Sequence, residues 1–267
     1  MAGVAKLNGA GSRSQTIDRA ALILTSFTME TPRLTLADLA GKLSLNQSTV
    51  YRYVATLQGA GLLERDGHQA GYRLGLRVIE LAGVALDQID VRREGLPEMD
   101  RLRDEMNLLV NLAVLDRGDV IHIAHSAPQG WPPRATTPGR RAVAHCTALG
   151  KVLLAYRPWE EVQGTIEQYG WRSYTTRSIQ DFDRLASALQ EIRQRGYSID
   201  DEERNRGTVC FGAPIRDHTS RVVASLSVSG TTQTLHPERQ AEVVRRLLEA
   251  ANRVSFRLGH IGTLAYE

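Results

Sequence analysis

Cysteine and aromatic residues are scarce in this sequence. Its 267 residues include only two cysteines, Cys146 and Cys210, and aromatic side chains account for 6%. Two distant cysteines lack the paired spacing of a structural metal site, and they are too few for the disulfide framework of a small secreted domain. We therefore expect two free thiols, no metal ion and no cofactor.

Long apolar runs are missing as well. No stretch approaches the roughly 20 apolar residues that a helix needs to cross a bilayer, and the first residues lack the basic and apolar segments of a secretory signal. We expect a cytoplasmic protein that makes no membrane contact. Residues Met1 to Ser14 are rich in Gly, Ala and Ser, and we expect them to form a disordered tail.

Neither sign of charge dominates, because the formal net charge is only +3. Up to Gly75 the chain has eight basic and five acidic residues, so the whole excess lies in this first part. A local basic excess is typical of a segment that contacts phosphates. Since the excess is small, one copy would hold DNA weakly, and we expect paired copies to bind.

Between Leu34 and Tyr72 the sequence has the pattern of a winged helix-turn-helix. Two apolar sets follow the spacing of one helix face; they are Leu36, Leu39, Ala40 and Leu43, then Val50, Tyr53, Val54 and Leu57. Thr35 with Asp38 predicts a capping box for the first helix, and Asn46 predicts a cap for the second. The wing is predicted from short strands at 62–65 and 72–74, which a glycine-bearing loop joins.

The second helix is the candidate DNA reader, because its polar residues lie at its start and on its outer side. These residues are Asn46, Gln47, Ser48, Thr49, Tyr51 and Arg52. Arg65, His68 and Arg73 flank the wing and are candidates for phosphate contacts. Helix pairs of this size also build protein-docking winged helices, so the pattern favours DNA without excluding a protein partner.

The predicted domains are the tail over 1–14, a winged helix-turn-helix domain over 15–75, a linker helix over 76–90 and a C-terminal domain over 91–260. In the C-terminal domain, segments with the hydrophobic period of a helix alternate with segments that have the period of a strand. This predicts an α+β protein with helices packed on one antiparallel sheet. The predicted strands are 108–115, 120–125, 209–215 and 222–228; the predicted helices are 91–107, 147–156, one capped by Ser178 with Asp181, and 237–257. A proline-rich loop over 127–144 is expected to fold over a site.

Three serines alternate on one predicted strand and therefore point to the same face. Ser225, Ser227 and Ser229 indicate a polar pocket, although a solvated sheet face is the alternative. The start of the helix at Thr147 adds backbone N–H groups, which could hold a ligand carboxylate. His122 and His125 are three apart on a strand, so we expect them to face opposite sides and to share no metal ion.

The sequence resembles the IclR family of transcriptional regulators over nearly the whole chain, from about Gln15 to Gly259. In the first domain the matching segments are 14–20, 47–52 and 72–75. In the second they are 145–151, 200–203 with Gly207 and Cys210, and 225–230. One departure is Gln47, where family members often carry a basic residue, so the operator sequence cannot be carried over.

The resemblance implies a GAF-like effector-binding domain in the C-terminal part, which responds to small organic acids, often aromatic ones. The partners would be a double-stranded DNA operator, a second copy in a homodimer or dimer of dimers, and RNA polymerase. It also implies that the effector contacts Thr147, Ala148, Leu149, Gly150, Asp200, Cys210, Ser227 and Ser229, with Trp131 and Arg134 as lids. Whether the protein represses or activates stays open.

Two other interpretations remain. The C-terminal domain of a winged-helix protein could only oligomerise or bind a protein partner. An enzyme would need Cys146 or Cys210 as nucleophile with a histidine such as His145 as base, but no spacing in the sequence supports that arrangement. We therefore expect a regulator and not an enzyme.

Overall fold

The computed structural model describes residues 14–67, 71–131 and 137–262. Nearly all of the predicted tail, together with His68 and Arg134, lies outside the described residues. The chain divides into two compact units, Met1–Gln88 and Ile89–Glu267. None of the described helices is both long and apolar enough to cross a membrane.

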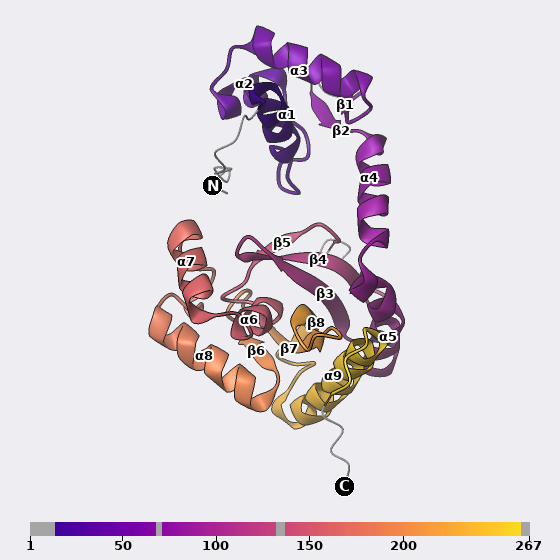
Figure 1. Ribbon diagram of the computed structural model, residues 1–267, viewed down its shortest axis with the longest axis vertical. Helices are drawn as coiled ribbons and strands as arrows, with labels where there is room; N and C mark the ends of the chain where they lie inside the picture. Colours follow the sequence, from indigo (N-terminus) through magenta and orange to yellow (C-terminus); the bar gives the residue numbers. More distant parts are fainter. Residues whose placement is uncertain (1–13, 68–70, 132–136, 263–267) are drawn as a thin grey trace. The chain divides into compact units, whose positions relative to one another are not determined.

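The first unit is a winged helix-turn-helix, as predicted (Figure 1). Its elements are α1 (Gln15–Thr25), α2 (Leu36–Leu43), α3 (Gln47–Gly59), β1 (Leu63–Arg65), β2 (Tyr72–Leu74) and α4 (Leu76–Asp87). The predicted apolar faces of α2 and α3 meet α1 and the wing in one core, where Ile23, Leu39 and Val50 are fully buried. The hydrophobic pattern of this segment therefore identified the part of the core that α2 and α3 supply.

Local hydrogen bonds set the ends of the two central helices. The capping box is confirmed: the amide of Asp38 donates to the Thr35 hydroxyl over 3.1 Å, and the amide of Thr35 donates to the Asp38 carboxylate over 2.8 Å. Asn46 also caps α3 as predicted, because its side-chain oxygen accepts from the Thr49 amide over 2.8 Å. These bonds satisfy N–H groups that a helix start leaves open.

The C-terminal unit is built on an antiparallel sheet whose described strands lie in the order β5-β4-β3-β8-β7-β6. The strands are β3 (Leu109–Asp116), β4 (Asp119–Ser126), β5 (Arg141–Val143), β6 (Ser198–Asp201), β7 (Thr208–Arg216) and β8 (Val222–Thr231). The helices are α5 (Asp90–Met106), α6 (Ala148–Ala155), α7 (Trp159–Tyr169), α8 (Phe182–Arg195) and α9 (Pro237–Arg257). This is the α+β class that the sequence predicted.

Helices cover both faces of this sheet (Figure 1). Leu112 faces α5, since a Cβ on Gly95 would come within 2.9 Å of its side chain. Its neighbour Ala113 faces the other way and packs in the cluster formed with α6, α7 and α8. Because successive strand residues point to opposite faces, α5 and α6 lie on opposite sides of the sheet.

One expectation about β4 was wrong. Opposite β3, Ala124 pairs with Leu112 and His122 pairs with Ala113, so Ile123 is an extra residue in a β-bulge. The bulge shifts the alternation by one residue. His122 and His125 therefore share a face of the sheet instead of pointing to opposite sides. Among the described residues there is still no group of three His, Cys, Asp or Glu side chains that could hold a metal ion.

The prediction was also incomplete between α6 and β7. Neither α7 nor β6 was predicted, and the segment treated as a loop over 127–144 contains β5. The predicted capping box of α8 was wrong, because Asp181 alone is the cap and accepts from the Arg184 amide. The Ser178 hydroxyl instead donates to the carbonyl of Glu203 over 2.7 Å. Ser178 therefore anchors the segment after β6.

Candidate functional site

The start of α3 presents most of the residues predicted to read DNA. Gln47, Ser48 and Arg52 are exposed, Tyr51 is 51% exposed, and Thr49 is half-buried. Asn46 is exposed too, but its side-chain oxygen accepts both from the Thr49 amide and from the Ser48 hydroxyl, over 2.8 and 2.9 Å. The exposed surface of α3 therefore offers amide, hydroxyl and guanidinium groups, the chemistry that contacts base edges and phosphates.

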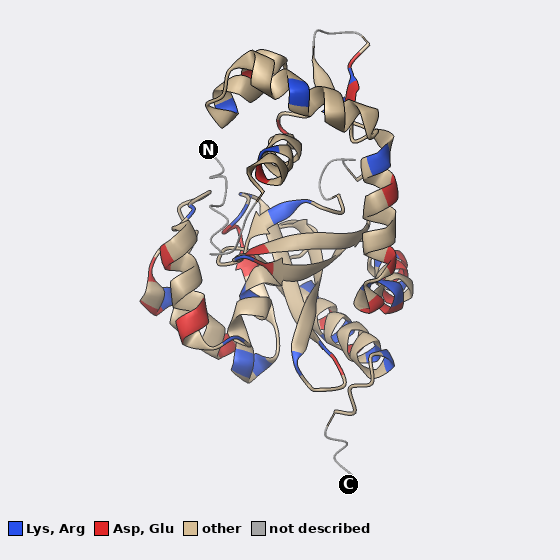
Figure 2. Cartoon of the chain, turned by 45° about the horizontal axis from the view of Figure 1, so that its top comes forward, with Lys and Arg blue, Asp and Glu red and all other residues tan. Residues whose placement is uncertain are grey.

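The wing arginines are already engaged within the unit. Arg73 on β2 donates to the carboxylate of Glu64 on β1 over 2.6 Å. The guanidinium of Arg65 lies 5.8 Å from the ring centroid of Tyr72, a cation–π contact. An intramolecular carboxylate partly neutralises Arg73, so this residue has less charge to offer a phosphate than Arg52 has. In Figure 2 the ribbon is blue at the positions of Lys and Arg.

A cavity of about 360 Å³ lies in the C-terminal unit, between the start of α6 and the face of the sheet. Eight of the ten residues predicted to bind effector line it: Trp131, Thr147, Ala148, Leu149, Asp200, Cys210, Ser227 and Ser229. The prediction missed Leu109, Asn111, His122, Arg140, Ala142, Arg204, Asn205 and Thr208, which also line it. Its size falls within the range of roughly 300–1,000 Å³ that is usual for small-molecule sites.

Strand register explains why these distant residues meet. Asp200 lies opposite Cys210, Cys210 opposite Ser229, and Ser229 opposite Leu109. One row of side chains therefore crosses β6, β7, β8 and β3 on the same face. In the next row Ser227 lies opposite Asn111. Alternation on β3 could have indicated Asn111, since it is a polar residue among apolar neighbours. The loop predicted over 127–144 contains Arg140 but did not single it out, and nothing in the sequence pointed to Arg204 or Asn205.

Ser225 and Gly150 do not line the cavity. The Ser225 hydroxyl donates to the carbonyl of Ala213 over 3.2 Å, so only two of the three aligned serines border the space. The amide of Gly150 donates to the Thr147 hydroxyl over 3.2 Å. A Cβ on Gly150 would lie 2.2 Å from the Cα of Ala144. Gly150 therefore allows α6 to begin tightly against the preceding turn, which places Thr147, Ala148 and Leu149 at the cavity.

The start of α6 is the electropositive part of the cavity wall. A helix leaves the N–H groups of its first turn without acceptors inside the helix, and here Thr147 caps the one on Gly150. Ala148 and Leu149 are the first two residues of α6, and both line the cavity. Arg140 and Arg204 also line the cavity, and the guanidinium of Arg204 lies 3.7 Å from the ring centroid of Tyr174. The wall is thus suited to a ligand that carries negative charge.

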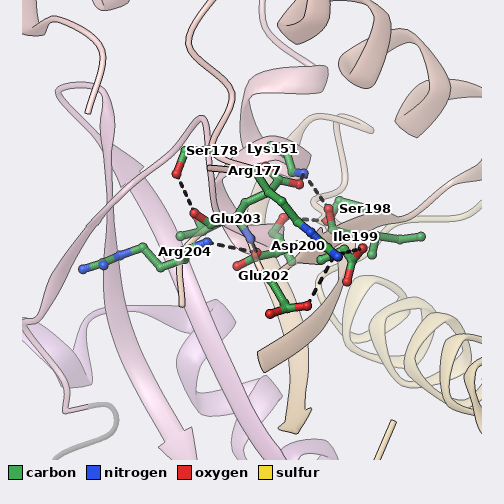
Figure 3. Close-up of polar contacts among 12 residues, drawn as sticks. Lys151, Arg177, Ser178, Ser198, Ile199, Asp200, Glu202, Glu203 and Arg204 are labelled. Atoms are coloured by element: carbon green, nitrogen blue, oxygen red, sulfur yellow. Dashed lines mark hydrogen bonds and ion pairs between the residues drawn. The ribbon is translucent and has the colours of Figure 1, made fainter. Parts of the chain in front are cut away.

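Asp200 is the acidic member of the wall, and it is 3% exposed. Figure 3 shows its polar contacts. Its Oδ1 accepts from the amides of Glu203 and Arg204 over 2.8 and 3.2 Å. Burial, together with the nearby Glu203, nevertheless raises the pKa of Asp200 to about 7. Near neutral pH a large share of Asp200 is therefore uncharged, which reduces its repulsion of an anionic ligand.

Behind Asp200 lies a buried ion pair. Lys151 on α6 is 3% exposed and donates both to the Glu203 carboxylate and, over 2.5 Å, to the carbonyl of Ile199. Burial raises the pKa of Glu203 even though Lys151 opposes this shift. The pair ties α6 to β6 and to the turn that follows it, so it fixes Asp200 and Arg204 relative to the helix start (Figure 3).

Both cysteines are held as neutral thiols. Burial raises the pKa of Cys146 to about 12, and burial and the nearby Asp200 also raise the pKa of Cys210, although that side chain faces the cavity. A thiol is a poor nucleophile until it loses its proton. His145 does not offset this, because its Nε2 interacts with the backbone carbonyl of Arg172 over 3.0 Å. The geometry thus disfavours a thiol-dependent reaction.

Comparisons with known proteins cover both units. Residues 16–67 match the IclR helix-turn-helix domain, and residues 83–256 match the bacterial transcriptional regulator IclR C-terminal domain. The transcriptional regulator XynR of Escherichia coli K12 is 29% identical over 92% of this chain and 98% of its own length. KdgR of the same organism is 31% identical over 84% of this chain and 86% of its own length.

Solved structures show the same fold. The IclR protein of Thermotoga maritima superposes with a TM-score of 0.72 at 26% identity, over 92% of this chain and 99% of that one. An IclR homolog from Microbacterium hydrocarbonoxydans, complexed with 4-hydroxybenzoate, superposes with a TM-score of 0.79 at 24% identity, over 91% of this chain and 98% of that one. These similarities extend over both units of the chain.

Proposed function

Because the chain belongs to the IclR family of bacterial transcriptional regulators, we propose that its C-terminal cavity senses a small organic acid and that the bound acid alters operator binding or transcription. The chain is a DNA-binding regulator with an effector-binding domain. The observation that carries the proposal is the start of α6, which faces a cavity together with Arg140, Arg204, Ser227 and Ser229. Helix N–H groups, guanidinium groups and hydroxyls form a set suited to a carboxylate.

The neutral form of Asp200 supports the same ligand class. A carboxylic acid has one charged end and an uncharged body, and the cavity pairs its polar groups with the apolar side chains of Leu109, Ala142 and Leu149. The relative from Microbacterium hydrocarbonoxydans, which shares the fold, binds 4-hydroxybenzoate. We propose that Thr147, Ala148, Ser227 and Ser229 hold the acid group. Trp131 also lines our proposed site.

For the DNA end we propose that Gln47, Ser48, Tyr51 and Arg52 on α3 contact the operator. Two copies would bind together, since the basic excess of one copy is small. The helix α4 supports self-association: none of its residues is buried, and Leu76, Ile79, Leu81 and Val84 are each more than half exposed. An apolar helix surface of this kind is stabilised when a second copy covers it.

We propose that signalling is a shift between populations. An acid that prefers one arrangement of the paired C-terminal units would change how the α3 helices of the two copies are arranged. The size of this shift is set by the difference between the affinities of the acid for the two arrangements. The chain segment α4 connects the two units covalently and is the route for this coupling.

The test needs an operator and a panel of acids. Full-length protein selects binding sites from a random duplex library, and the recovered site is then footprinted with and without each acid. We expect at least one carboxylic acid to raise the melting temperature of the protein and to change its operator affinity or its transcription in vitro. If no acid in a broad panel does either, a C-terminal unit that only oligomerises or binds a protein partner becomes the better interpretation.

A further inference from the structure

Two side chains in the cavity wall carry buried polar atoms that no other described residue satisfies. They are Oδ1 of Asn111 on β3 and Nδ1 of His122 on β4. Asn111 is 3% exposed and His122 is 6% exposed. A buried polar atom without a hydrogen bond lowers stability, and native proteins hold few of them. Since both side chains line the cavity, a molecule bound there is the partner that would satisfy them.

The two side chains lie close enough to contact one ligand group. Without the bulge at Ile123, His122 would point to the opposite face of the sheet. With the bulge, His122 lies opposite Ala113, two residues along β3 from Asn111. Such diagonal neighbours on one face have backbones about 7–8 Å apart, and long side chains reach across that gap. The bulge therefore creates a shared polar corner in the wall.

The atoms at this corner restrict which ligand group fits. Burial, followed by the charges of Arg140 and His125, lowers the pKa of His122 to about 4, so the ring is neutral at physiological pH. A neutral imidazole has one N–H donor and one acceptor, and the oxygen of Asn111 only accepts. A second carboxylate or a ketone would bring no proton for that oxygen. A ligand ammonium would be repelled by Arg140 and Arg204. A hydroxyl both donates and accepts, which satisfies the corner.

The corner is remote from the helix start. The Ser198 hydroxyl on β6 donates to the carbonyl of Ala148 over 2.6 Å, and a Cβ on Gly212 of β7 would lie 2.8 Å from the same oxygen. The start of α6 therefore lies over β6 and β7. Only β8 separates β7 from β3, so two strand spacings, about 10 Å, lie between β7 and Asn111. One ligand that touches both places must be polar at both ends.

We propose that Asn111 and His122 select effectors that carry a hydroxyl several bonds away from their carboxylate. This inference rests on the proposed function of the cavity as an organic-acid site. It assigns a specificity role to two residues on β3 and β4, at the opposite end of the cavity from Asp200 and Cys210.

The test compares acids that differ by one hydroxyl. Calorimetry with the full-length chain measures hexanoate against 6-hydroxyhexanoate and 2-hydroxyhexanoate, and benzoate against 4-, 3- and 2-hydroxybenzoate. We expect at least one acid with a remote hydroxyl to bind tenfold or more tightly than its parent, because the parent leaves the buried atoms unpaired. We expect no such gain from the 2-hydroxy isomers.

Variants separate recognition from structure. Asn111→Leu combined with His122→Phe should reduce the preference for the hydroxy acid to within about twofold, whereas Ser225→Ala, on the same face but outside the cavity, should keep it. Asn111→Leu alone should raise the melting temperature of the ligand-free chain, because it removes a buried side-chain oxygen that has no hydrogen bond, at similar volume. A lower melting temperature would mean that Asn111 has a structural role, and would overturn the inference.

The remaining outcomes are distinct. If parent and hydroxy acids bind with equal affinity, the specificity inference is wrong while the organic-acid function stands. If none of these acids binds while another carboxylic acid of the broad panel does, the inference is wrong and the organic-acid function stands. If no acid of the broad panel binds, both fail.

Discussion

The backbone N–H of Glu203 donates to Oδ1 of Asp200 over 2.8 Å and closes a turn that holds a buried carboxyl against the cavity. Arg204 adds a second N–H bond to the same oxygen. Two such bonds favour the charged form, but they do not offset the cost of burial, and the pKa of Asp200 is about 7. Its protonation state therefore changes near physiological pH.

The protonation of Asp200 should make the free energy of unfolding depend on pH. The pKa of Asp200 in the folded chain lies above its ordinary value of 3.8, so its contribution to stability is fully present below about pH 4 and is lost as the pH rises through about 7. Asp200→Asn should match the wild type in urea unfolding at pH 4 and exceed it by about 2–4 kcal/mol at pH 8. A difference that stays constant with pH would contradict this.

Asp217→Asn is the matched control with the opposite sign. A hydrogen bond from Thr219 lowers the pKa of this exposed carboxyl, so its contribution is present above about pH 4 and is lost as the pH falls further. This variant should be less stable than the wild type at pH 8, and the difference should disappear in acid.

In the wild type, the affinity for the effector should depend on the protonation of Asp200 as well. Above pH 7 the charged Asp200 would repel a bound carboxylate, so the affinity of any acid that binds should fall severalfold between pH 6 and pH 8.5. In Asp200→Asn the affinity should change little over this range. Calorimetry at several pH values in buffers of different ionisation enthalpy measures both the affinity and the proton taken up on binding. An equal decline in both proteins would place the titrating group elsewhere.

Two glycine substitutions should have opposite effects on the C-terminal unit. Gly150→Ala places a Cβ 2.2 Å from the backbone of Ala144, so we expect a loss of about 1–3 kcal/mol in the free energy of unfolding, and weaker acid binding. Gly164→Ala in α7 meets no atom within 4 Å among the described residues and should stabilise the chain by about 0.5–1 kcal/mol. Urea unfolding of both variants checks this. Equal effects would show that the close approach at Gly150 is unimportant.

Arg52 and Arg73 should differ in their contribution to DNA binding. Arg52→Ala removes an exposed guanidinium from α3, so operator affinity should fall and its dependence on the logarithm of salt concentration should weaken by about 0.9 per copy. Arg73→Ala should have the smaller effect, because Glu64 already pairs with that side chain. Fluorescence anisotropy at several salt concentrations measures both slopes. A larger effect of Arg73 would move the main phosphate contact to the wing.

A buried carboxylate links α5 to α9. Glu98 is 4% exposed and accepts from Arg253 and Arg257 over 2.8 and 2.9 Å. Glu98→Ala leaves two guanidinium groups without this partner, so we expect a loss of about 2–4 kcal/mol. Glu249→Ala breaks a pair on the surface of α9, where charges of both signs alternate (Figure 2), and should cost under about 1 kcal/mol. Similar losses in the two variants would show that burial of Glu98 does not matter.

The sequence predicted the winged helix-turn-helix well because its determinants are local. The spacing of Leu39, Val50 and Val54 and the caps at Thr35 and Asn46 act within a few residues, and hydrophobic periodicity records them directly. In the C-terminal unit the same reasoning found α5, α6, α8, α9 and four strands. It missed β6 because Ser198–Asp201 is short and polar, and its place at the sheet edge depends on pairing with β7.

For the cavity, local pattern gave the helix start at Thr147 and the alternating serines, and the family resemblance added Asp200 and Cys210. Ser225 and Gly150 turned out to lie outside the wall, since the carbonyl of Ala213 and the backbone of Ala144 occupy the space beside them. Arg204 and Asn205 follow β6 and enter the wall only because the turn after that strand folds back toward α6.

The sequence by itself determined the two-part organisation, the α+β class, the helix-turn-helix pair and the helix start at Thr147, because each depends on periodicity and capping over short stretches of chain. Only the tertiary structure decided which polar side chains share one buried space. The register of five strands brings Asp200, Ser229 and Asn111 to one face, and an extra residue at Ile123 turns His122 toward them. Register and bulges arise from pairing between distant segments, which local patterns do not record.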